Sequence, residues 1–497
     1  MPSPPEPPPL SVNAPNVLLV GLGLHARRAH YPALLELRKR GVVGEIIVVD
    51  LAERRRAVEA YLDKQPCAPI ECLYLAGEDR VPSAEHLERL DRAVSRHGVR
   101  AVVISTEPTS HLPYLRWALD HQLPVLVDKP VIAADGVTEN LDRALGLAHD
   151  FRAALTHYAE ARHGDPACQV TVVTPRRFHP LYLRVKELVA EVARATGCPV
   201  TSVTAEYGDG EWRMPHQIAE QTYHPLNTGY GMLTHSGYHA LDTALWLAES
   251  DAGSGGPFDD IVATSAFSMP RDHLAQLPEE VTAAALGDAA AVQAAYADAR
   301  RLDRPEHSFG EIDAHALLRL RRRGRTITTV GLHALHCSLT ARAWVSNKGR
   351  NLYTGNGRIR QEVYSVQQGP FQSIKILCLQ STDPQGLYAV GGERHCEAHV
   401  FRNDLVRDEW RAYERIDLGD IEDADDHELA VGPGKAALMS SWLDASAAPG
   451  GVSPSDLRQH WVSAAALSAI YASHVRGAVT GLETGMPHRI DLRTPDA

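Results

Sequence analysis

The stretch Val20–Ala26, VGLGLHA, decides the fold of this chain of 497 residues when it is taken together with Asp50. Apolar residues at 17–20 predict a buried strand that breaks at the first glycine, and a helix is predicted from about Leu24 to Arg40. A second apolar run, 46–49, ends on Asp50. Strand, glycine turn, helix, strand and terminal acid together form a unit that binds a dinucleotide.

Each small residue of the turn has a separate physical role in that unit. Gly21 allows the tight turn, Gly23 lets the backbone approach a pyrophosphate, and Ala26 lets helix and strand pack closely. Free N–H groups at the start of the helix face the phosphates. The residues of this turn that we assign to the cofactor are Gly21, Gly23, Leu24, His25 and Ala26.

The acid at the end of the second strand bears on which dinucleotide binds. A carboxylate at Asp50 accepts hydrogen bonds from the ribose hydroxyls and repels a 2′-phosphate, so the sequence favours NAD(H) over NADP(H). The arginines 54–56 could instead clamp a phosphate, but Glu53 and Glu59 are interleaved with them. That mixture of charges is typical of the solvated face of a helix.

Composition excludes several classes of protein. The formal net charge of −12 argues against a surface that binds nucleic acid. Seven cysteines with no CxxC pair predict no disulfide framework, which fits a reducing cytoplasm. No uncharged apolar run is long enough to cross a bilayer. The proline-rich start, MPSPPEPPPL, is expected to be disordered and is not a signal peptide.

The order of predicted elements indicates an α/β protein with two domains. Residues 1–15 form the proline-rich tail, and 16–175 form a Rossmann domain with a doubly wound parallel sheet. Residues 176–490 form an α+β domain with a large, mostly antiparallel sheet, insertions near 271–307 and 352–425, one inserted alanine-rich helix at 278–301 and a last helix at 455–476. The predicted strands are 17–20, 46–49, 99–104, 124–127, 169–173, 200–207, 261–268, 313–321, 325–335, 374–379 and 398–401.

Four further segments make the prediction more specific. They are STEP at 105–108 with His111, VLVDKP at 125–130, RRFHP at 176–180 and GYGMLTHSGYHALD at 229–242. Together with the glycine turn they resemble the Gfo/Idh/MocA family of oxidoreductases from residue 16 to 247. The resemblance implies a C-terminal sheet whose face often builds dimers or tetramers, so a homo-oligomer is expected.

By this resemblance Lys129 is the active-site lysine, here preceded by Asp128 where the family usually has glutamate. A lysine that follows a buried strand at the carboxyl edge of a parallel sheet lies where ligands bind. Its ammonium can hold a substrate oxygen and favour the negative charge that develops on it. Pro130 follows, and the peptide bond before it is often cis in this family. His239 matches the family's histidine and would be the general acid/base.

His235, His239 and Asp242 are spaced to share one stripe of a helix. Two histidines at this spacing could bind zinc, but no third ligand is evident, so we predict no metal site. A pair of structural histidines is the other alternative. We expect His235 to be a catalytic helper or a substrate contact.

His235 stands where dehydrogenases of the family commonly carry an aspartate. Thr234-His235 resembles the Thr-His pair of NAD-dependent glycosidases, which favours a redox-neutral glycosidase as one alternative function. A non-catalytic regulator that senses a dinucleotide is another.

Further residues are assigned through the same resemblance. Ser105, Thr106 and His111 would lie beside the nicotinamide ribose, and Arg177 near the carboxamide. The substrate candidates besides His235 are Arg213, Tyr223 and His224. The sequence thus predicts a cytoplasmic, NAD(H)-dependent oxidoreductase that transfers hydride between nicotinamide and a secondary alcohol or ketone of a sugar, cyclitol or related polyol. Its expected partners are a small polar substrate and further copies of the same chain, with no nucleic acid and no membrane.

Overall fold

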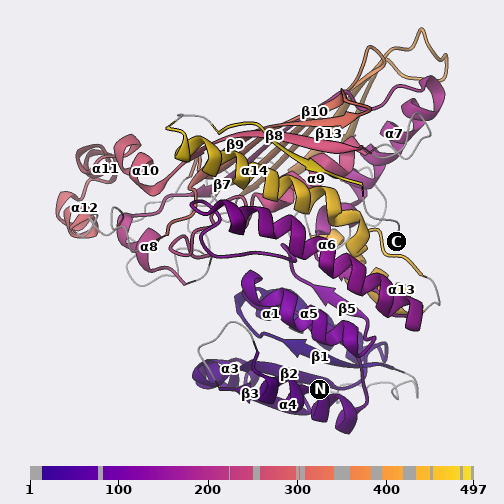
Figure 1. Ribbon diagram of the computed structural model, residues 1–497, viewed down its shortest axis with the longest axis vertical. Helices are drawn as coiled ribbons and strands as arrows, with labels where there is room; N and C mark the ends of the chain where they lie inside the picture. The colour runs from indigo at the N-terminus through magenta and orange to yellow at the C-terminus, as the bar shows by residue number, and fades with distance from the viewer. Residues whose placement is uncertain are drawn as a thin grey trace, which may run out of the picture.

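A computed structural model describes the chain over residues 14–76, 82–222, 224–249, 258–297, 302, 308–340, 359–381, 395–417, 432–447, 451–481 and 485–493. Two sheets dominate these residues, one in the N-terminal part and one in the C-terminal part, with helices between them (Figure 1). The predicted fold class is confirmed, since the first sheet is parallel throughout and the second is mostly antiparallel.

The parallel sheet has the strand order β3-β2-β1-β4-β5-β6. This order reverses direction next to β1, which places the glycine turn at the crevice where such sheets bind ligands. The strands are β1 (Asn16–Val20), β2 (Ile46–Leu51), β3 (Glu71–Leu75), β4 (Val99–Ile104), β5 (Val125–Val127) and β6 (Val170–Val172). The covering helices are α1 (Leu24–Arg28), α2 (His30–Lys39), α3 (Arg55–Leu62), α4 (Ala84–His97), α5 (His111–Asp120) and α6 (Leu141–Gly164).

The single helix predicted from Leu24 to Arg40 is wrong. The chain forms α1 and then α2, separated at Ala29, whose backbone departs from helical geometry with φ −118° and ψ −63°. The break lets His30 enter the protein interior at the start of α2, where it is buried. A continuous helical pattern in the sequence gives no sign of this change of direction.

The second sheet has nine strands in the order β14-β13-β12-β11-β7-β10-β9-β8-β15. All neighbours are antiparallel except β7 and β10, which run parallel, so the ends of these two strands meet at one edge. The strands are β7 (Ser202–Glu211), β8 (Asp260–Ser268), β9 (Asp313–Arg322), β10 (Arg325–Cys337), β11 (Ile359–Gln368), β12 (Gln372–Ser381), β13 (His395–Arg402), β14 (Tyr413–Asp417) and β15 (His488–Asp491). The sequence analysis missed β3, β11, β14 and β15.

Helices pack on one face of the second sheet, between it and the Rossmann domain (Figure 1). They are α7 (Pro180–Thr196), α9 (Tyr238–Ala248) and α14 (Trp461–Val479), with the short α8 (Pro215–Glu220) nearby. The helix α13 (Gly432–Ala447) returns to the N-terminal part, where Trp442 joins the hydrophobic cluster of β1 and β2.

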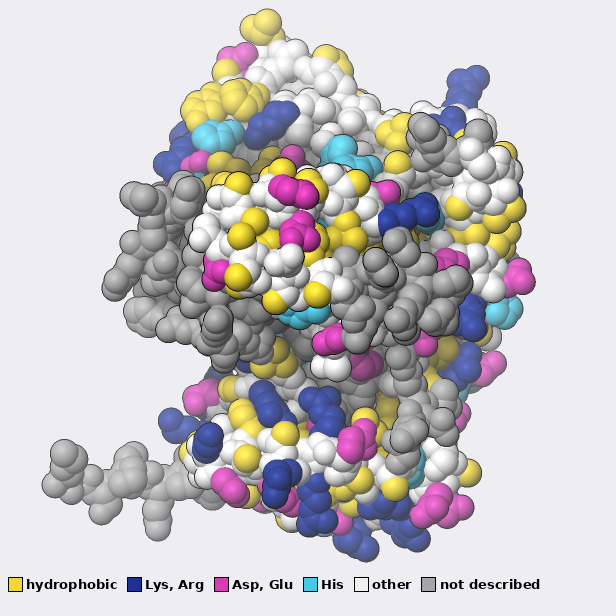
Figure 2. All heavy atoms as spheres, turned by 90° about the vertical axis from the view of Figure 1, so that its left-hand side faces the viewer, with side chains coloured by type: hydrophobic (Ala, Val, Ile, Leu, Met, Phe, Trp, Pro, Cys, Tyr) yellow, Lys and Arg dark blue, Asp and Glu magenta, His cyan; other side chains and the backbone are white. Residues whose placement is uncertain are grey.

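The predicted inserted helix at 278–301 is instead broken into shorter pieces. They are α11 (Glu279–Leu286) and α12 (Ala289–Tyr296), with Gly287 ending α11 in the left-handed conformation at φ +68°, and the short α10 (Pro270–Gln276) precedes them. They project from one end of the large sheet, and hydrophobic and acidic side chains mix on their surface (Figure 2).

The prediction of no disulfide is also wrong. Cys378 on β12 and Cys396 on β13 lie directly opposite one another and are bonded. Strand register brought the two together, and their spacing in the sequence carried no signal of it. Cysteine content therefore no longer favours the cytoplasm, and the compartment stays a prediction. Among the described residues, none of the helices is both long and apolar enough to span a bilayer.

Candidate active site

The glycine turn after β1 is built as a dinucleotide site requires. Gly21 has φ +90°, and a Cβ on it would lie 2.4 Å from the backbone oxygen of Ser105, so only glycine fits. The Asp50 carboxylate accepts hydrogen bonds from the backbone N–H groups of Leu22, at 2.9 Å, and Leu51, at 2.8 Å. The acid at the end of β2 therefore also fixes the shape of the turn.

One of the three arginines after β2 faces this acid. Arg54 Nε lies 3.9 Å from Asp50 Oδ1, and its guanidinium is also 3.9 Å from where a Cβ of Gly23 would stand. Arg55 instead pairs with Glu59 at 2.8 Å on the exposed face of α3. The solvated-face interpretation thus holds for Arg55, whereas Arg54 lies beside the predicted ribose site.

Lys129 follows β5 and reaches across to the second domain. Its Nζ donates a short hydrogen bond to the backbone oxygen of His235, and the Lys129–Pro130 peptide bond is cis. Burial lowers the pKa of Lys129 to about 7, with Arg176 and Arg360 adding to the shift and Asp128 only partly opposing it. This ammonium is held in a fixed place and is poised to change its charge near neutral pH.

The acid before the lysine is tied to the glycine turn. Asp128 Oδ1 lies 2.8 Å from His30 Nε2 and 3.7 Å from His25 Nε2, and Oδ2 accepts a 2.5 Å hydrogen bond from Ser105. Burial opposes ionisation, yet the two histidines hold the pKa of Asp128 well below its usual range. The loops after β1, β4 and β5 are therefore locked together beside Lys129.

His111 takes part in the same framework from behind. It is buried, with Nδ1 2.8 Å from the backbone oxygen of Pro130 and Nε2 3.0 Å from that of Thr106. Both ring nitrogens face protein carbonyls, so His111 braces the two loops and offers no atom to a cofactor. Thr106 is half-buried at the surface of the same loop.

The two histidines of the second domain do not share a helical stripe, contrary to the prediction. His235 lies in the turn 231–237, and α9 begins only at Tyr238. His235 Nε2 is 2.8 Å from the backbone oxygen of Pro225, so that nitrogen donates to a carbonyl and is unavailable to a metal. Its ring stacks on that of His224, with centroids 4.6 Å apart.

His239 lies in the first turn of α9 and is half-buried. Burial lowers its pKa well below the usual value, and the charges of Arg176, Lys129 and Arg360 lower it further. Its Nδ1 has no hydrogen-bond partner among the residues that the structure describes. The imidazole is therefore neutral near pH 7, and it shares its surroundings with Lys129.

The substrate candidates are brought to the same place in part. Arg213 is buried and donates to the backbone oxygen of His224 at 3.2 Å. His224 has a positive φ of 49°, a strained conformation that is frequent at functional sites. Tyr223 lies outside the described residues.

Several site residues were missed by the sequence analysis. Asp209 at the end of β7 is buried, and its carboxylate accepts a hydrogen bond from the Ser236 hydroxyl at 3.1 Å. Two cationic or ionisable side chains lie near the same carboxylate. His336 Nδ1, at the end of β10, is 3.4 Å away, and Arg360 Nε, at the start of β11, is 3.9 Å away. The parallel pairing of β7 with β10 collects these residues at one edge. Asp209 and His336 follow the strands predicted at 200–207 and 325–335, whereas Arg360 belongs to β11, which was not predicted.

Two buried residues face the interior: Arg177, which the resemblance placed near the carboxamide, and Thr234, which belongs to the glycosidase alternative. Arg177 is 1% exposed and donates two hydrogen bonds to Asp242 on α9. Asp242 also lies 3.1 Å from His460 at the start of α14. Arg177 therefore joins these two helices in the interior and cannot contact a cofactor. Thr234 is buried, with its hydroxyl 2.8 Å from that of Tyr471. The Thr-His pair of the glycosidase alternative is therefore split, since Thr234 faces the interior.

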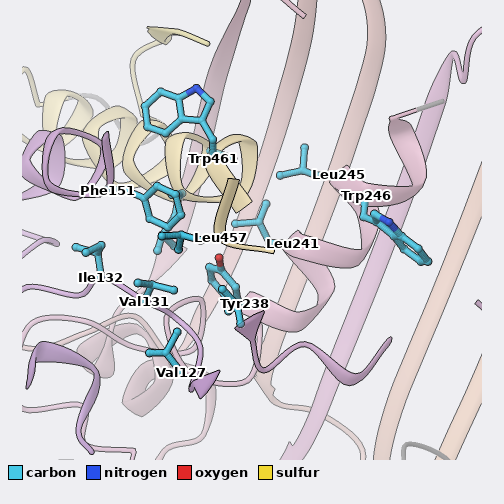
Figure 3. Packing of buried hydrophobic residues seen from close by; sticks show 14 of the residues in the cluster. Val127, Val131, Ile132, Phe151, Tyr238, Leu241, Leu245, Trp246, Leu457 and Trp461 are labelled. Atoms are coloured by element: carbon cyan, nitrogen blue, oxygen red, sulfur yellow. The ribbon is translucent and has the colours of Figure 1, made fainter. Parts of the chain in front are cut away.

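A continuous hydrophobic cluster joins the segments that carry the two catalytic candidates, Lys129 and His239. Val131 and Ile132, just after Lys129, pack beside Phe151 of α6, Tyr238 of α9 and Trp461 of α14 (Figure 3). Because Tyr238 immediately precedes His239, this packing holds the segments that carry Lys129 and His239 in fixed positions relative to one another.

One group of described residues has ligand atoms close enough to share a metal ion. His25, His30 and Asp128 place them within 4.8 Å of one another. The hydrogen bonds of His30 and Ser105 already account for the Asp128 carboxylate. The absence of a metal stays a prediction.

Comparison with known proteins finds solved structures with a similar fold. No family model matches the chain, and no curated protein matches it in sequence. An oxidoreductase domain protein from Kribbella flavida has a similar structure, with a TM-score of 0.57 and 13% identity over 97% of this chain and 99% of that one.

Two further structures of this fold have named ligands. An oxidoreductase from Agrobacterium radiobacter in complex with NAD+, L-tartaric acid and magnesium has a TM-score of 0.53 and 14% identity, covering 96% of this chain and 98% of its own. An aldose-aldose oxidoreductase from Caulobacter crescentus, complexed with glycerol, has a TM-score of 0.52 and 14% identity. The match covers 96% of this chain and 99% of that one. At these identities the likeness shows the fold alone, which agrees with the parallel and the mostly antiparallel sheet described above.

Proposed function

We propose that this protein is an NAD(H)-dependent oxidoreductase that transfers hydride between nicotinamide and a secondary alcohol or ketone of a sugar, cyclitol or related polyol. The observation that carries the proposal is the placement of Lys129. Its ammonium leaves the carboxyl edge of the parallel sheet, next to the glycine turn, and bonds to the segment that carries His239. One site thus combines a dinucleotide turn, a cation and a neutral imidazole.

The residues at the dinucleotide turn fit NAD(H). Among the described residues, a Cβ on Gly23 would meet only the Arg54 guanidinium within 4 Å, so its backbone is open to a pyrophosphate, and Asp50 lies at the expected ribose position. We assign the cofactor to Gly21–Ala26, Asp50, Ser105 and Thr106. When bound, NAD(H) supplies or accepts the hydride.

The remaining chemistry falls to two side chains. Lys129 holds the substrate oxygen and stabilises the negative charge that develops on it. His239, neutral near pH 7, takes the hydroxyl proton during oxidation and returns it during reduction. His224, His235 and Arg213 border this pair and contact the substrate.

The structural relatives support this proposal through their own ligands. One of them binds NAD+ with a hydroxy acid, and another is an aldose oxidoreductase. The redox-neutral glycosidase loses the support of Thr234, whose hydroxyl is bonded to Tyr471. A regulator that only senses the dinucleotide would have no need for a buried lysine beside an imidazole.

An absorbance screen tests the function. The protein is mixed with NAD+ and a panel of sugars, cyclitols and aryl glycosides. We expect at least one polyol to give NADH in proportion to the ketone formed. Release of an aryl alcohol without net NADH would identify the glycosidase, and NAD(H) binding without any turnover would identify the sensor.

The charge of Lys129 predicts the pH dependence of ketone reduction. Its pKa is lowered to about 7, so the charged form that holds the oxyanion is present below pH 7 and is lost above it. We expect kcat/KM for reduction to fall above pH 7 both because Lys129 loses its charge and because the protonated form of His239 becomes scarcer. In Lys129→Arg, whose guanidinium stays charged, only the second cause remains, so the fall per pH unit should be about tenfold smaller; an unchanged profile in that variant would contradict the assignment.

The cofactor preference depends on Asp50. In Asp50→Asn we expect the KM for NAD to rise about tenfold, because a hydrogen bond to a charged group is weakened. The same change should improve NADP, because repulsion of the 2′-phosphate is removed beside Arg54. Adding Arg54→Gln should abolish the gain for NADP. Steady-state KM values for both cofactors measure this, and an unchanged ratio in Asp50→Asn would disprove the role of the acid.

We also propose that the protein forms a homo-oligomer through the open face of the large sheet. The described helices pack on the other face (Figure 1), and Leu317, Phe401 and Tyr413 are each more than 40% exposed. Leu317→Glu is expected to shift the mass measured by light scattering toward the monomer. Leu405→Glu, in the exposed turn between β13 and β14, is the control and should leave the mass unchanged.

A further inference from the structure

Glu311 is a buried carboxylate with no place in the mechanism above. It immediately precedes the segment that leads into β9 and is 0% exposed. Its Oε1 accepts hydrogen bonds from the backbone N–H of Leu233, at 2.7 Å, and from the hydroxyl of Tyr471, at 2.9 Å. Its Oε2 has no partner within the described residues. Burial of a carboxyl group costs free energy unless hydrogen bonds compensate for the lost water. The two groups that supply these hydrogen bonds therefore indicate what Glu311 does.

Both bonds lead to the turn 231–237. The Tyr471 hydroxyl also lies 2.8 Å from the hydroxyl of Thr234. Since Tyr471 donates to Glu311, Thr234 donates to the Tyr471 oxygen. Glu311 therefore grips two consecutive residues of the turn, Leu233 directly through its backbone and Thr234 through α14.

The backbones of the two segments are also in contact. A Cβ on Gly231 would lie 2.0 Å from the backbone oxygen of Glu311, and that oxygen accepts from Met232 N at 3.0 Å. The turn cannot slide away from Glu311 without breaking this contact. Side chain and main chain of one residue thus fix three residues in a row.

The next residue along the chain is His235, whose backbone oxygen accepts the hydrogen bond of Lys129. His239 follows four residues later in the first turn of α9. We propose that Glu311 is a positioning residue of the active site, which holds the His235 carbonyl and so directs the Lys129 ammonium, without touching substrate or cofactor. The proposal rests on the proposed function for what Lys129 does, whereas the placement of Lys129 can be tested without turnover.

Two substitutions separate hydrogen bonding from charge. Burial raises the pKa of Glu311 to about 7, so its carboxyl is only partly ionised near neutral pH, and both of its forms can accept the two hydrogen bonds. Glu311→Leu has a similar size but accepts no hydrogen bond. Glu311→Gln keeps a carbonyl oxygen that accepts from both Leu233 and Tyr471, so this variant should be rescued.

The chain offers a matched control for the tyrosine. Tyr158 is as buried as Tyr471 and donates to the buried carboxylate of Asp456 at 2.8 Å, while its oxygen accepts from Val170 N and Arg162, and none of these three partners belongs to the turn 231–237. Tyr471→Phe and Tyr158→Phe therefore remove equivalent hydroxyl groups, of which only the first acts on the active site.

The experiment measures kcat, KM and the rate at which an amine-reactive ester acylates Lys129, read by peptide mass spectrometry, with thermal unfolding as the test of folding. For Glu311→Leu we expect kcat to fall by up to about 100-fold at nearly constant KM for NAD, with a changed acylation rate. Glu311→Gln should stay within a few-fold of the native protein. In Tyr471→Phe we expect kcat to fall about tenfold. In Tyr158→Phe we expect only thermal stability to fall, with kcat and the acylation rate unchanged.

A folded Glu311→Leu with native kcat and native acylation rate would overturn the proposal, as would equal losses in the leucine and glutamine variants. If Glu311→Leu does not fold, unchanged kcat and acylation in Tyr471→Phe overturn it. If the native protein transfers no hydride, the proposed function fails, and the acylation rate alone decides whether Glu311 positions Lys129.

Discussion

Lys129→Ala is expected to lower kcat/KM for hydride transfer by about 10²- to 10³-fold, the loss seen when one preorganised donor is removed from a developing oxyanion. This corresponds to about 3 to 4 kcal/mol of transition-state stabilisation. The effect should be large because the ammonium is buried and anchored to the His235 carbonyl, so water cannot replace it in the same geometry.

The variant is best measured beside two others. NADH binding, followed by fluorescence, should stay near native in Lys129→Ala, because the glycine turn and Asp50 are untouched. Lys64→Ala removes an exposed lysine and should leave every parameter unchanged. A Lys129→Ala protein that is folded and retains native kcat/KM would exclude Lys129 from catalysis.

His239→Ala is expected to lower kcat by about 10²- to 10⁴-fold, the range of a general acid/base. The imidazole lies beside Lys129, it is neutral near pH 7, and no described residue bonds to its Nδ1. His235 is a weaker candidate for this role, because its Nε2 is occupied by the Pro225 carbonyl.

Added imidazole distinguishes proton transfer from a structural role. It should restore part of the activity of His239→Ala, because it can occupy the space that the side chain leaves. His157→Asn is the control, since His157 pairs with Asp120 on the Rossmann domain and touches no site residue. Loss of activity in His239→Ala that follows loss of folding, with no rescue by imidazole, would assign His239 a structural role.

The sequence was sufficient for the parts of the site that depend on local pattern. Gly21, Asp50 and Lys129 each follow a strand of strong apolar character, and a parallel sheet places the residues after its strands at one edge. The predicted fold class is confirmed for the same reason. The chemical roles of these residues stay predictions until the variants are made.

The missed residues depend on contacts between distant segments. Asp209, His336 and Arg360 meet only because β7 pairs with β10 on one side and β11 on the other. The strand β11 escaped prediction because Glu362 interrupts its apolar positions, and that carboxylate is buried with its charge paired to Arg176. No local pattern in the sequence carries such information.

Local pattern also misplaced two groups. Spacing put His235 and His239 on one helical face, but the turn 231–237 is held in contact with Glu311 and delays the helix until Tyr238. The resemblance put Arg177 beside the cofactor, whereas Asp242 binds it in the interior. In both cases a buried carboxylate far along the chain decided the outcome.

The most direct test of hydride transfer uses NADH that carries deuterium at both hydrogens of nicotinamide C4, so that either face of the ring delivers the label, during reduction of a polyol-derived ketone. The account predicts one deuterium on the new alcohol carbon for each NADH consumed, in the native protein and at a far lower rate in Lys129→Ala. Product formed without deuterium, or with no consumption of NADH, would contradict it.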